Sequence, residues 1–121
     1  MIAVIFQVEP NAGRAQEYLD LAAGLRGELE QIDGFISVER FESVYTPGKF
    51  VSLSFWRDEA AIRRWREHLG HQQAQRRGRG ELFAGYRISV AQIVRDYGPG
   101  EDEREQAPAA VSATWGGAPA S

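Results

Sequence analysis

The stretch Phe50-Val-Ser-Leu-Ser-Phe-Trp56 decides the fold, because it is a strand that carries apolar side chains on both of its faces. Side chains alternate between the two faces of a strand. One face therefore carries Val51, Leu53 and Phe55, and the other carries Phe50, Ser52, Ser54 and Trp56. A composition rich in aromatic and aliphatic residues is typical of a strand inside a sheet. We expect this segment to be a central strand.

The residues before this strand predict a hairpin. From Phe35 to Ser43 the pattern has a period of two, and Tyr45-Thr-Pro-Gly48 is a typical turn. In this segment we expect Ile36 and Val38 on one face, with the opposite face formed by Phe35, Ser37, Glu39 and Phe41.

The residues after the strand predict a helix. Asp58 is a suitable N-cap, and the apolar residues that follow at three-four spacing are Ile62, Trp65 and Leu69. We expect Gly70 to interrupt this helix before a further helical stretch over 71–77.

Both ends of the domain add one more strand, and the N-terminal end also adds a helix. Ile2 to Val8 predicts a strand buried on both sides, and Tyr86 to Tyr97 predicts the last one. Asn11 is a plausible N-cap for a helix to about Ile32, and Gly34 suits the left-handed position after the end of that helix. The apolar stripe of the helix consists of Tyr18, Ala22, Leu25, Leu29 and Ile32. The order β-α-β-β-α-β is that of an α+β, ferredoxin-like fold with an antiparallel sheet.

Composition sets the boundaries of the domain and its surroundings. We expect residues 1–97 to form one domain and residues 98–121, rich in Ala, Pro and Gly, to be a disordered tail in which Trp115 is incidental. The N-terminus lacks the basic start of a signal peptide, and no apolar run reaches membrane-spanning length, so a cytoplasmic protein without membrane contact is expected. The chain has no cysteine, which excludes thiolate chemistry.

The charges argue against nucleic-acid binding. The net charge is −3, and the arginines from Arg63 to Arg79 share their segment with Glu59, Glu67 and Glu81. RNA-recognition modules have the same element order, but their third strand needs glycines between its aromatic residues, and residues 49–56 have none.

Every predicted strand has apolar residues on both faces, whereas helices cover only one face of a ferredoxin-like sheet. The second face would expose a large apolar patch in a monomer. Two sheets packed face to face would bury it, so we expect a homodimer.

Two junctions of the chain resemble a known family. These are Asp33-Gly-Phe-Ile-Ser-Val-Glu39 and Ser54-Phe-Trp-Arg-Asp-Glu-Ala60, followed by Trp65, His68, His71 and Gln75. Over residues 2–97 the chain is similar to the antibiotic biosynthesis monooxygenase domain. The resemblance implies a dimeric α/β barrel with a ligand cavity between helices and sheet in each subunit. It also implies members that oxidise aromatic polyketides to quinones with O₂ and no cofactor.

The resemblance points to Trp65 first, since family members have a cavity-facing tryptophan at this place. His71 is the second catalytic candidate, because it follows Trp65 by six residues and is one of the chain's two histidines. His68, Phe6, Tyr86 and Arg87 are the substrate-binding candidates. Histidine spacing typical of a metal site is absent from the sequence.

Two other functions stay open at this point. Haem-degrading relatives have an axial histidine nine or ten residues after the tryptophan and an asparagine near the end of the first strand. Here those positions hold Ala74 or Gln75, and Phe6 or Gln7, which counts against haem, although His71 offers a shifted ligand. The third hypothesis is a non-catalytic ligand-binding or stress-response domain. The sequence does not specify the substrate.

Overall fold

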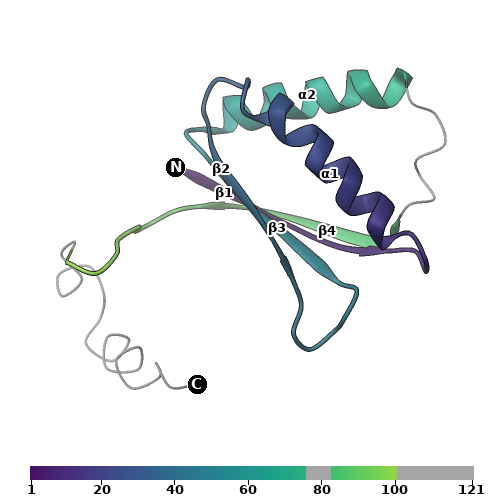
Figure 1. The fold of residues 1–121 in the computed structure, drawn as a ribbon. Coiled ribbons are helices and arrows are strands. Elements are labelled where there is room, and N and C mark those ends of the chain that lie inside the picture. Colours follow the sequence, from purple (N-terminus) through teal and green to yellow (C-terminus); the bar gives the residue numbers. More distant parts are fainter. Residues whose placement is uncertain (76–82, 101–121) are drawn as a thin grey trace.

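A computed structural model describes residues 1–75 and 83–100, with only the backbone described for residues 71–75. The predicted element order is confirmed (Figure 1); the elements are β1 (Ile2–Pro10), α1 (Ala15–Leu29), β2 (Phe35–Glu42), β3 (Phe50–Trp56), α2 (Glu59–Gln75) and β4 (Phe83–Gln92). The expected disordered tail lies outside the described residues from Glu101 onward, and so does Trp115.

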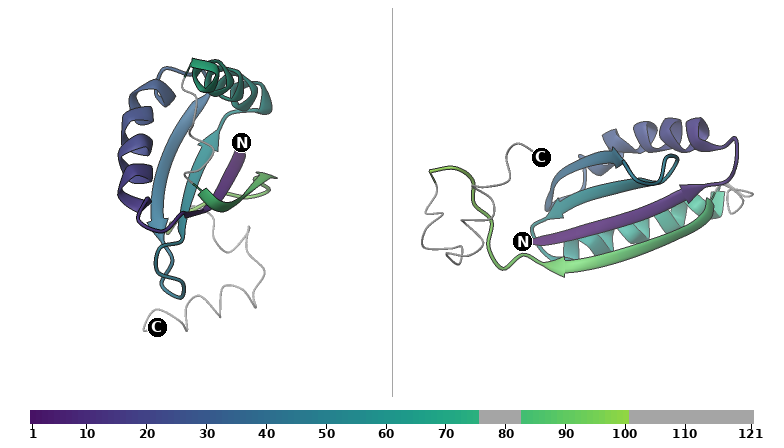
Figure 2. Two further views of the ribbon diagram at one scale, coloured as in Figure 1. Left: turned by 90° about the vertical axis from the view of Figure 1, so that its right-hand side faces the viewer. Right: turned by 90° about the horizontal axis from the view of Figure 1, so that it is seen from below.

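The four strands form one antiparallel sheet in the order β2-β3-β1-β4. β3 has a strand on each side, as its composition predicted. Both helices lie on the same side of the sheet, and seen from below the strands stand in front of them (Figure 2). The ferredoxin-like α+β fold is therefore confirmed.

The core between helices and sheet consists of two clusters. One contains Ile2, Leu29, Trp56, Ala61 and Ile62, and lies where α2 begins. The other contains Val8, Tyr18 and Phe50, at the opposite end of the central strands. Between the two clusters, β3 presents only the small side chains of Ser52 and Ser54 to the helices.

The helix boundaries differ from the prediction in three places. α1 begins at Ala15 after Arg14 with no side-chain cap, so Asn11 is not its cap, although the Asn11 carbonyl accepts the backbone N–H of Arg14. α1 ends at Leu29, so Gly34 is not its C-terminal residue and lies instead in the turn before β2. Gly70 does not interrupt α2, because its position is open and a single glycine there costs the helix only about 1 kcal/mol.

Two strands also differ in detail. The register shifts between Phe35 and Ser37, so Phe35 joins Val38 on the helix side and Ile36 is exposed. A pattern of strict alternation could not foresee this bulge. β4 spans Phe83–Gln92, starting earlier and ending earlier than predicted, and leaves Val94 outside the sheet.

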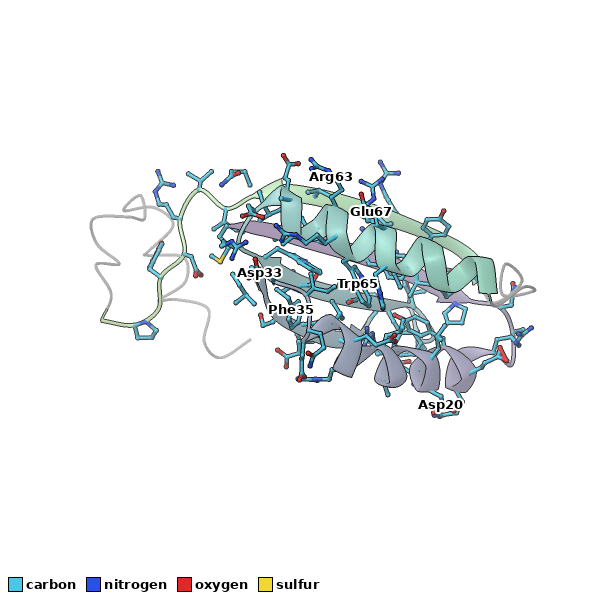
Figure 3. The ribbon with its side chains drawn as sticks, turned by 90° about the horizontal axis from the view of Figure 1, so that it is seen from above. Asp20, Asp33, Phe35, Arg63, Trp65 and Glu67 are labelled. Atoms are coloured by element: carbon cyan, nitrogen blue, oxygen red, sulfur yellow. The ribbon has the colours of Figure 1, made fainter. Side chains whose placement is uncertain are left out.

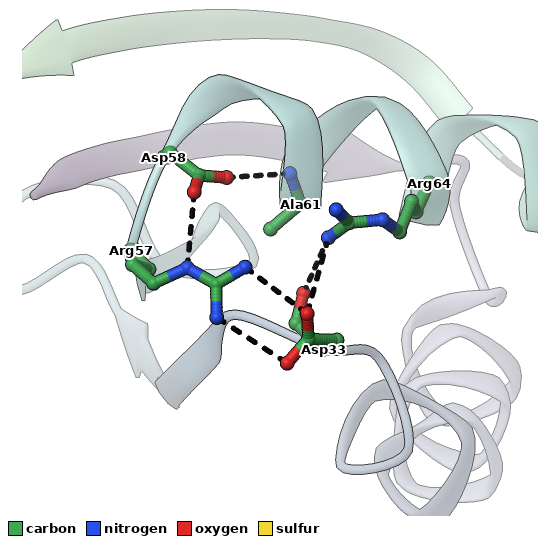
Figure 4. A network of polar contacts seen from close by, with 5 residues as sticks. All are labelled: Asp33, Arg57, Asp58, Ala61 and Arg64. Carbon is green, nitrogen blue, oxygen red and sulfur yellow. Dashed lines mark hydrogen bonds and ion pairs between the residues drawn. The ribbon is translucent and has the colours of Figure 1, made fainter.

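A polar junction ties the turn before β2 to the start of α2 (Figure 4), and its residues are Asp33, Arg57, Asp58, Ala61 and Arg64. The Arg57 guanidinium donates to both Asp33 carboxylate oxygens at 3.1 and 3.3 Å and to Asp58 at 3.0 Å. Asp58 accepts the Ala61 N–H at 2.9 Å, which confirms it as the N-cap of α2. Hydrogen bonds from Arg57 lower the pKa of both carboxyls below the usual range.

The same junction brings backbone into close contact. The Arg57 N–H donates to the Gly34 carbonyl at 2.7 Å. Gly34 has φ +94°, and a Cβ built there would lie 2.6 Å from the Ala61 Cβ. Gly34 is therefore required both by its backbone angle and by the closeness of α2.

The face of the sheet that the helices leave open is apolar mainly along its two central strands. β1 contributes Ala3 and Ile5, and β3 contributes Val51, Leu53 and Phe55. The outer strands add one large apolar side chain, Phe41, and otherwise small or polar ones, which are Ser37, Glu39, Arg87, Ser89 and Ala91. β4 contributes only Ala91 as an apolar residue to this face, because the strand ends at Gln92 and leaves the expected Ile93 outside it.

Gly34→Ala should lower the free energy of unfolding by more than the roughly 1–3 kcal/mol of a left-handed non-glycine residue alone, because it adds a clash with Ala61. Gly13→Ala is the matched control, since Gly13 has φ +77° and nothing within 4 Å of its virtual Cβ. Urea unfolding of both variants measures the difference. Equal losses would mean that α2 does not lie against Gly34 in solution.

Candidate functional site

α2 packs on the sheet at its first turns and becomes less buried along its length. Ala61 and Ile62 are buried in the core, whereas Trp65, His68 and Leu69 on the same side of the helix are only partly buried. Figure 3 shows Trp65 pointing from α2 into the region between the two helices, above the sheet, while Arg63 and Glu67 point outward. The junction at Asp58 therefore determines where Trp65 lies.

Trp65 and His68 form a stacked pair one helical turn apart. Their ring centroids are 5.5 Å apart, with an angle of 26° between the ring planes. The edge of Trp65 that faces the core packs against the cluster around Trp56 and Ile62. His68 Nε2 also lies 3.1 Å from the Glu28 Oε1, which links α2 to α1.

A second group of side chains lies on the helix side of β1 and β4, and we call it the helix-side strip; its members are Phe6, Phe83, Tyr86, Ile88 and Val90. The strand register places Phe6, Tyr86, Ile88 and Val90 on this face. Phe6 contacts the ring of Tyr86 at 5.9 Å and that of Phe83 at 6.1 Å between centroids. Tyr86, Ile88 and Val90 remain 66%, 56% and 52% exposed. The helices thus leave this part of their own face uncovered.

The arrangement suits a flat, apolar ligand. Aromatic rings of the helix-side strip offer stacking surfaces, and an indole and an imidazole lie on the helix above the same face of the sheet. Apolar walls with a few polar groups are the usual composition of a small-molecule site. Among residues 1–70 and 83–100, no three His, Asp or Glu side chains are grouped so that they could hold a metal ion.

Six candidate site residues were chosen from the sequence. The structure places four of them on the helix side of the sheet, where they form two pairs. One pair is Trp65 with His68, and the other is Phe6 with Tyr86. Arg87 does not join them, because it pairs with Gln7 on the opposite face. His71 lies in α2, and its side chain is outside the described residues.

Two residues of this region were not chosen from the sequence. Glu28 lies on the polar flank of the α1 stripe, and only the packing of α1 beside α2 brings it to His68. Phe83 was placed before the last strand, but β4 begins with it. Its aromatic side chain, close to the predicted strand, is the feature of the sequence that could have identified it.

The sequence model of the family described as antibiotic biosynthesis monooxygenase matches residues 1–77 of the chain. The chain belongs to this family. Two relatives extend the match. The jasmonate monooxygenase ABM of Pyricularia oryzae is 41% identical over 104 residues, which are 86% of this chain and 48% of that protein. The uncharacterised protein YqjZ of Bacillus subtilis is 34% identical over 62 residues, 51% of this chain and 53% of that protein. The chain thus spans about half the length of these relatives.

Solved structures of the family share the fold. A putative antibiotic biosynthesis monooxygenase from Deinococcus radiodurans has a TM-score of 0.65 at 20% identity, covering 81% of this chain and 97% of that one. The haem degrader MhuD of Mycobacterium tuberculosis has a TM-score of 0.65 at 17% identity, covering 81% and 100%. At these identities the likeness concerns the fold alone. Within the described residues, no helix is long and apolar enough to cross a membrane.

Proposed function

We propose that this protein binds a small aromatic or planar molecule and oxidises it with O₂ without a metal or organic cofactor. The observation that carries the proposal is the Trp65–His68 pair on α2, above the same face of the sheet as the exposed helix-side strip. Membership of a monooxygenase family and the relative named for jasmonate oxidation support an oxygenase over a simple binding domain. We expect the protein to act in the cytoplasm.

The proposed reaction needs the protein to do two things. An electron-rich phenolate or enolate can reduce O₂ directly, so the site must stabilise that anion and shield it from water. The indole N–H of Trp65 is a donor suited to an oxyanion. The apolar side chains of the helix-side strip, with Phe6 and Ile88 near its centre, would exclude water around a bound ring.

Trp65→Phe should lower the rate of O₂ consumption with an anthrone, in metal-chelated buffer, by on the order of 10²-fold, as expected for the loss of one oxyanion donor. Phenylalanine retains an aromatic ring against the core cluster, so the unfolding midpoint should change little. An oxygen electrode and quinone absorbance measure the rate.

Tyr45→Phe is the control for this experiment, because Tyr45 lies almost fully exposed in the β2–β3 loop and loses a polar group without touching the site. Its rate should equal that of the wild type. If Trp65→Phe consumes O₂ at the wild-type rate, Trp65 has only a packing role. Binding of the anthrone without any oxidation by the wild type would leave the ligand-binding domain as the function.

We further propose that the chain is a homodimer with the two open sheet faces packed together. Ile5 and Leu53 are cross-strand partners near the centre of that face, next to Val51 and Phe55. These four side chains are only partly buried in the single chain, and an apolar surface of this kind is typical of an interface between subunits.

Sedimentation at micromolar concentration should give twice the 13.5 kDa mass of the chain. Leu53→Lys places a charge at the centre of the open face and should give monomers, because an unpaired buried charge is strongly unfavourable. Val44→Lys at the exposed hairpin loop is the control and should stay dimeric. A wild type that sediments only at 13.5 kDa would contradict the proposed dimer.

The residues present do not fit haem degradation. Phe6 is apolar and packs on Tyr86, and the amide of its neighbour Gln7 lies on the opposite face of the sheet, so neither residue offers an amide on the helix side of β1. His68 is partly buried and already lies against Glu28 and Trp65. The likeness to MhuD therefore concerns the fold and does not extend to these side chains.

Haemin added to the purified protein should accordingly give no stoichiometric Soret shift typical of iron–histidine ligation. Haemin titration followed by absorbance measures this. If a 1:1 complex forms instead, His71→Ala should abolish the shift and His68→Ala should not. That result would restore haem as the ligand and displace the cofactor-free reaction.

A further inference from the structure

His68 is held from two directions by residues of two different helices. The Trp65 ring stacks on it within α2, and the Glu28 carboxylate reaches its Nε2 from α1 at 3.1 Å. The His68 and Glu28 side chains are 37% and 34% exposed, so neither is sealed in the core. A hydrogen bond at such exposure contributes only about 1 kcal/mol to stability. The pair therefore orients the ring more than it stabilises the fold.

The contact with Glu28 selects one tautomer of the neutral ring. A carboxylate accepts hydrogen bonds, so Nε2 carries the proton when His68 is neutral and its lone pair then lies on Nδ1. A carboxylate that fixes the tautomer of an imidazole also stabilises the imidazolium formed when the other nitrogen takes up a proton. The same logic operates in catalytic carboxylate–histidine pairs.

We propose that His68 is the proton acceptor and donor of the oxygenation and that Glu28 is its positioning residue. This inference rests on the proposed function, because it assigns roles within the same reaction. It differs from the sequence-based expectation, in which His71 had the catalytic role and His68 only contacted substrate.

The proton steps balance for an anthrone as substrate. The CH₂ carbon loses a proton to Nδ1 of His68, and the enolate formed transfers one electron to O₂. The radical pair combines into a C–O bond at that carbon, and the peroxide anion takes the proton back from His68. His68 then removes the remaining C–H proton while the O–O bond breaks, and returns it to the departing hydroxide. The products are the quinone and water, with O₂ as the oxidant and His68 neutral at the end.

The orientation of the ring can be tested without any substrate. In protein labelled with ¹⁵N at histidine, His68 should show the Nε2–H tautomer, and its signals are separated from those of His71 by the spectrum of a His71→Gln variant. Glu28→Ala should shift His68 toward a tautomer mixture, whereas Glu28→Gln keeps an acceptor oxygen and should keep the bias. Glu30→Ala, at the exposed C-cap residue that follows α1, is the control and should leave the spectrum unchanged. An Nδ1–H tautomer in the wild type would overturn the role of Glu28.

The proton-transfer role is tested by turnover of the anthrone. His68→Ala should lower kcat by on the order of 10²-fold, the smaller end of general-base effects, with little change in KM. Added imidazole should restore part of the rate, which no structural loss would allow. Glu28→Ala should show a smaller loss than His68→Ala, recovered in Glu28→Gln.

The outcomes separate this inference from the proposed function. If the wild type oxidises the anthrone and His68→Ala does so at the same rate, His68 is not the base although the oxygenase proposal stands. A loss in His68→Ala that imidazole does not restore also overturns the base role. If the wild type consumes no substrate, the proposed function and the base role both fail, while the tautomer measurement still decides whether Glu28 orients His68.

Discussion

The close contact between the turn before β2 and the first turn of α2 is the constraint on which the candidate site depends. Gly34 lies so near Ala61 that no side chain fits there, and the Arg57 guanidinium ties Asp33 to the N-cap residue Asp58. The ion pairs among these contacts are exposed to solvent, so they add little stability. Their effect is geometric, because they determine where α2 begins and hence which turn carries Trp65 and His68.

The fixed start of α2 also explains why part of the helix side stays uncovered. The helix is buried only where Ala61 and Ile62 meet the cluster around Trp56. Farther along, β3 presents only the small, buried side chains of Ser52 and Ser54 to the helices, so no large apolar side chain of β3 joins the two core clusters.

The fold was largely predictable from the sequence because its signals are periodic. The alternation over Phe50–Trp56 gave a strand with the observed bounds, and Asp58 was recognised as an N-cap from its residue type alone. The failures have local physical causes. The bulge at Ile36 reverses the face of Phe35 without changing composition, and the unbroken helix through Gly70 shows that one glycine is too weak a signal to end a helix. Arg87 was misplaced for a different reason, since it was chosen together with Tyr86 although neighbouring residues of a strand point to opposite faces of the sheet.

The site was less predictable, because it depends on contacts between elements that are far apart in sequence. Glu28 and His68 are separated by forty positions, and nothing in either segment marks them as partners. The family resemblance pointed to Trp65 as a candidate, but it could not separate oxygenase from haem degrader. Structures with nearly the same TM-score include both a haem degrader and a putative antibiotic biosynthesis monooxygenase. A fold shared at this level constrains the chemistry little, so the distinction must come from individual side chains. In this chain those are an apolar Phe6 in the middle of β1 and His68 on α2 beside the Glu28 carboxylate, and it is on these two residues that the proposed choice of proton transfer over iron ligation rests.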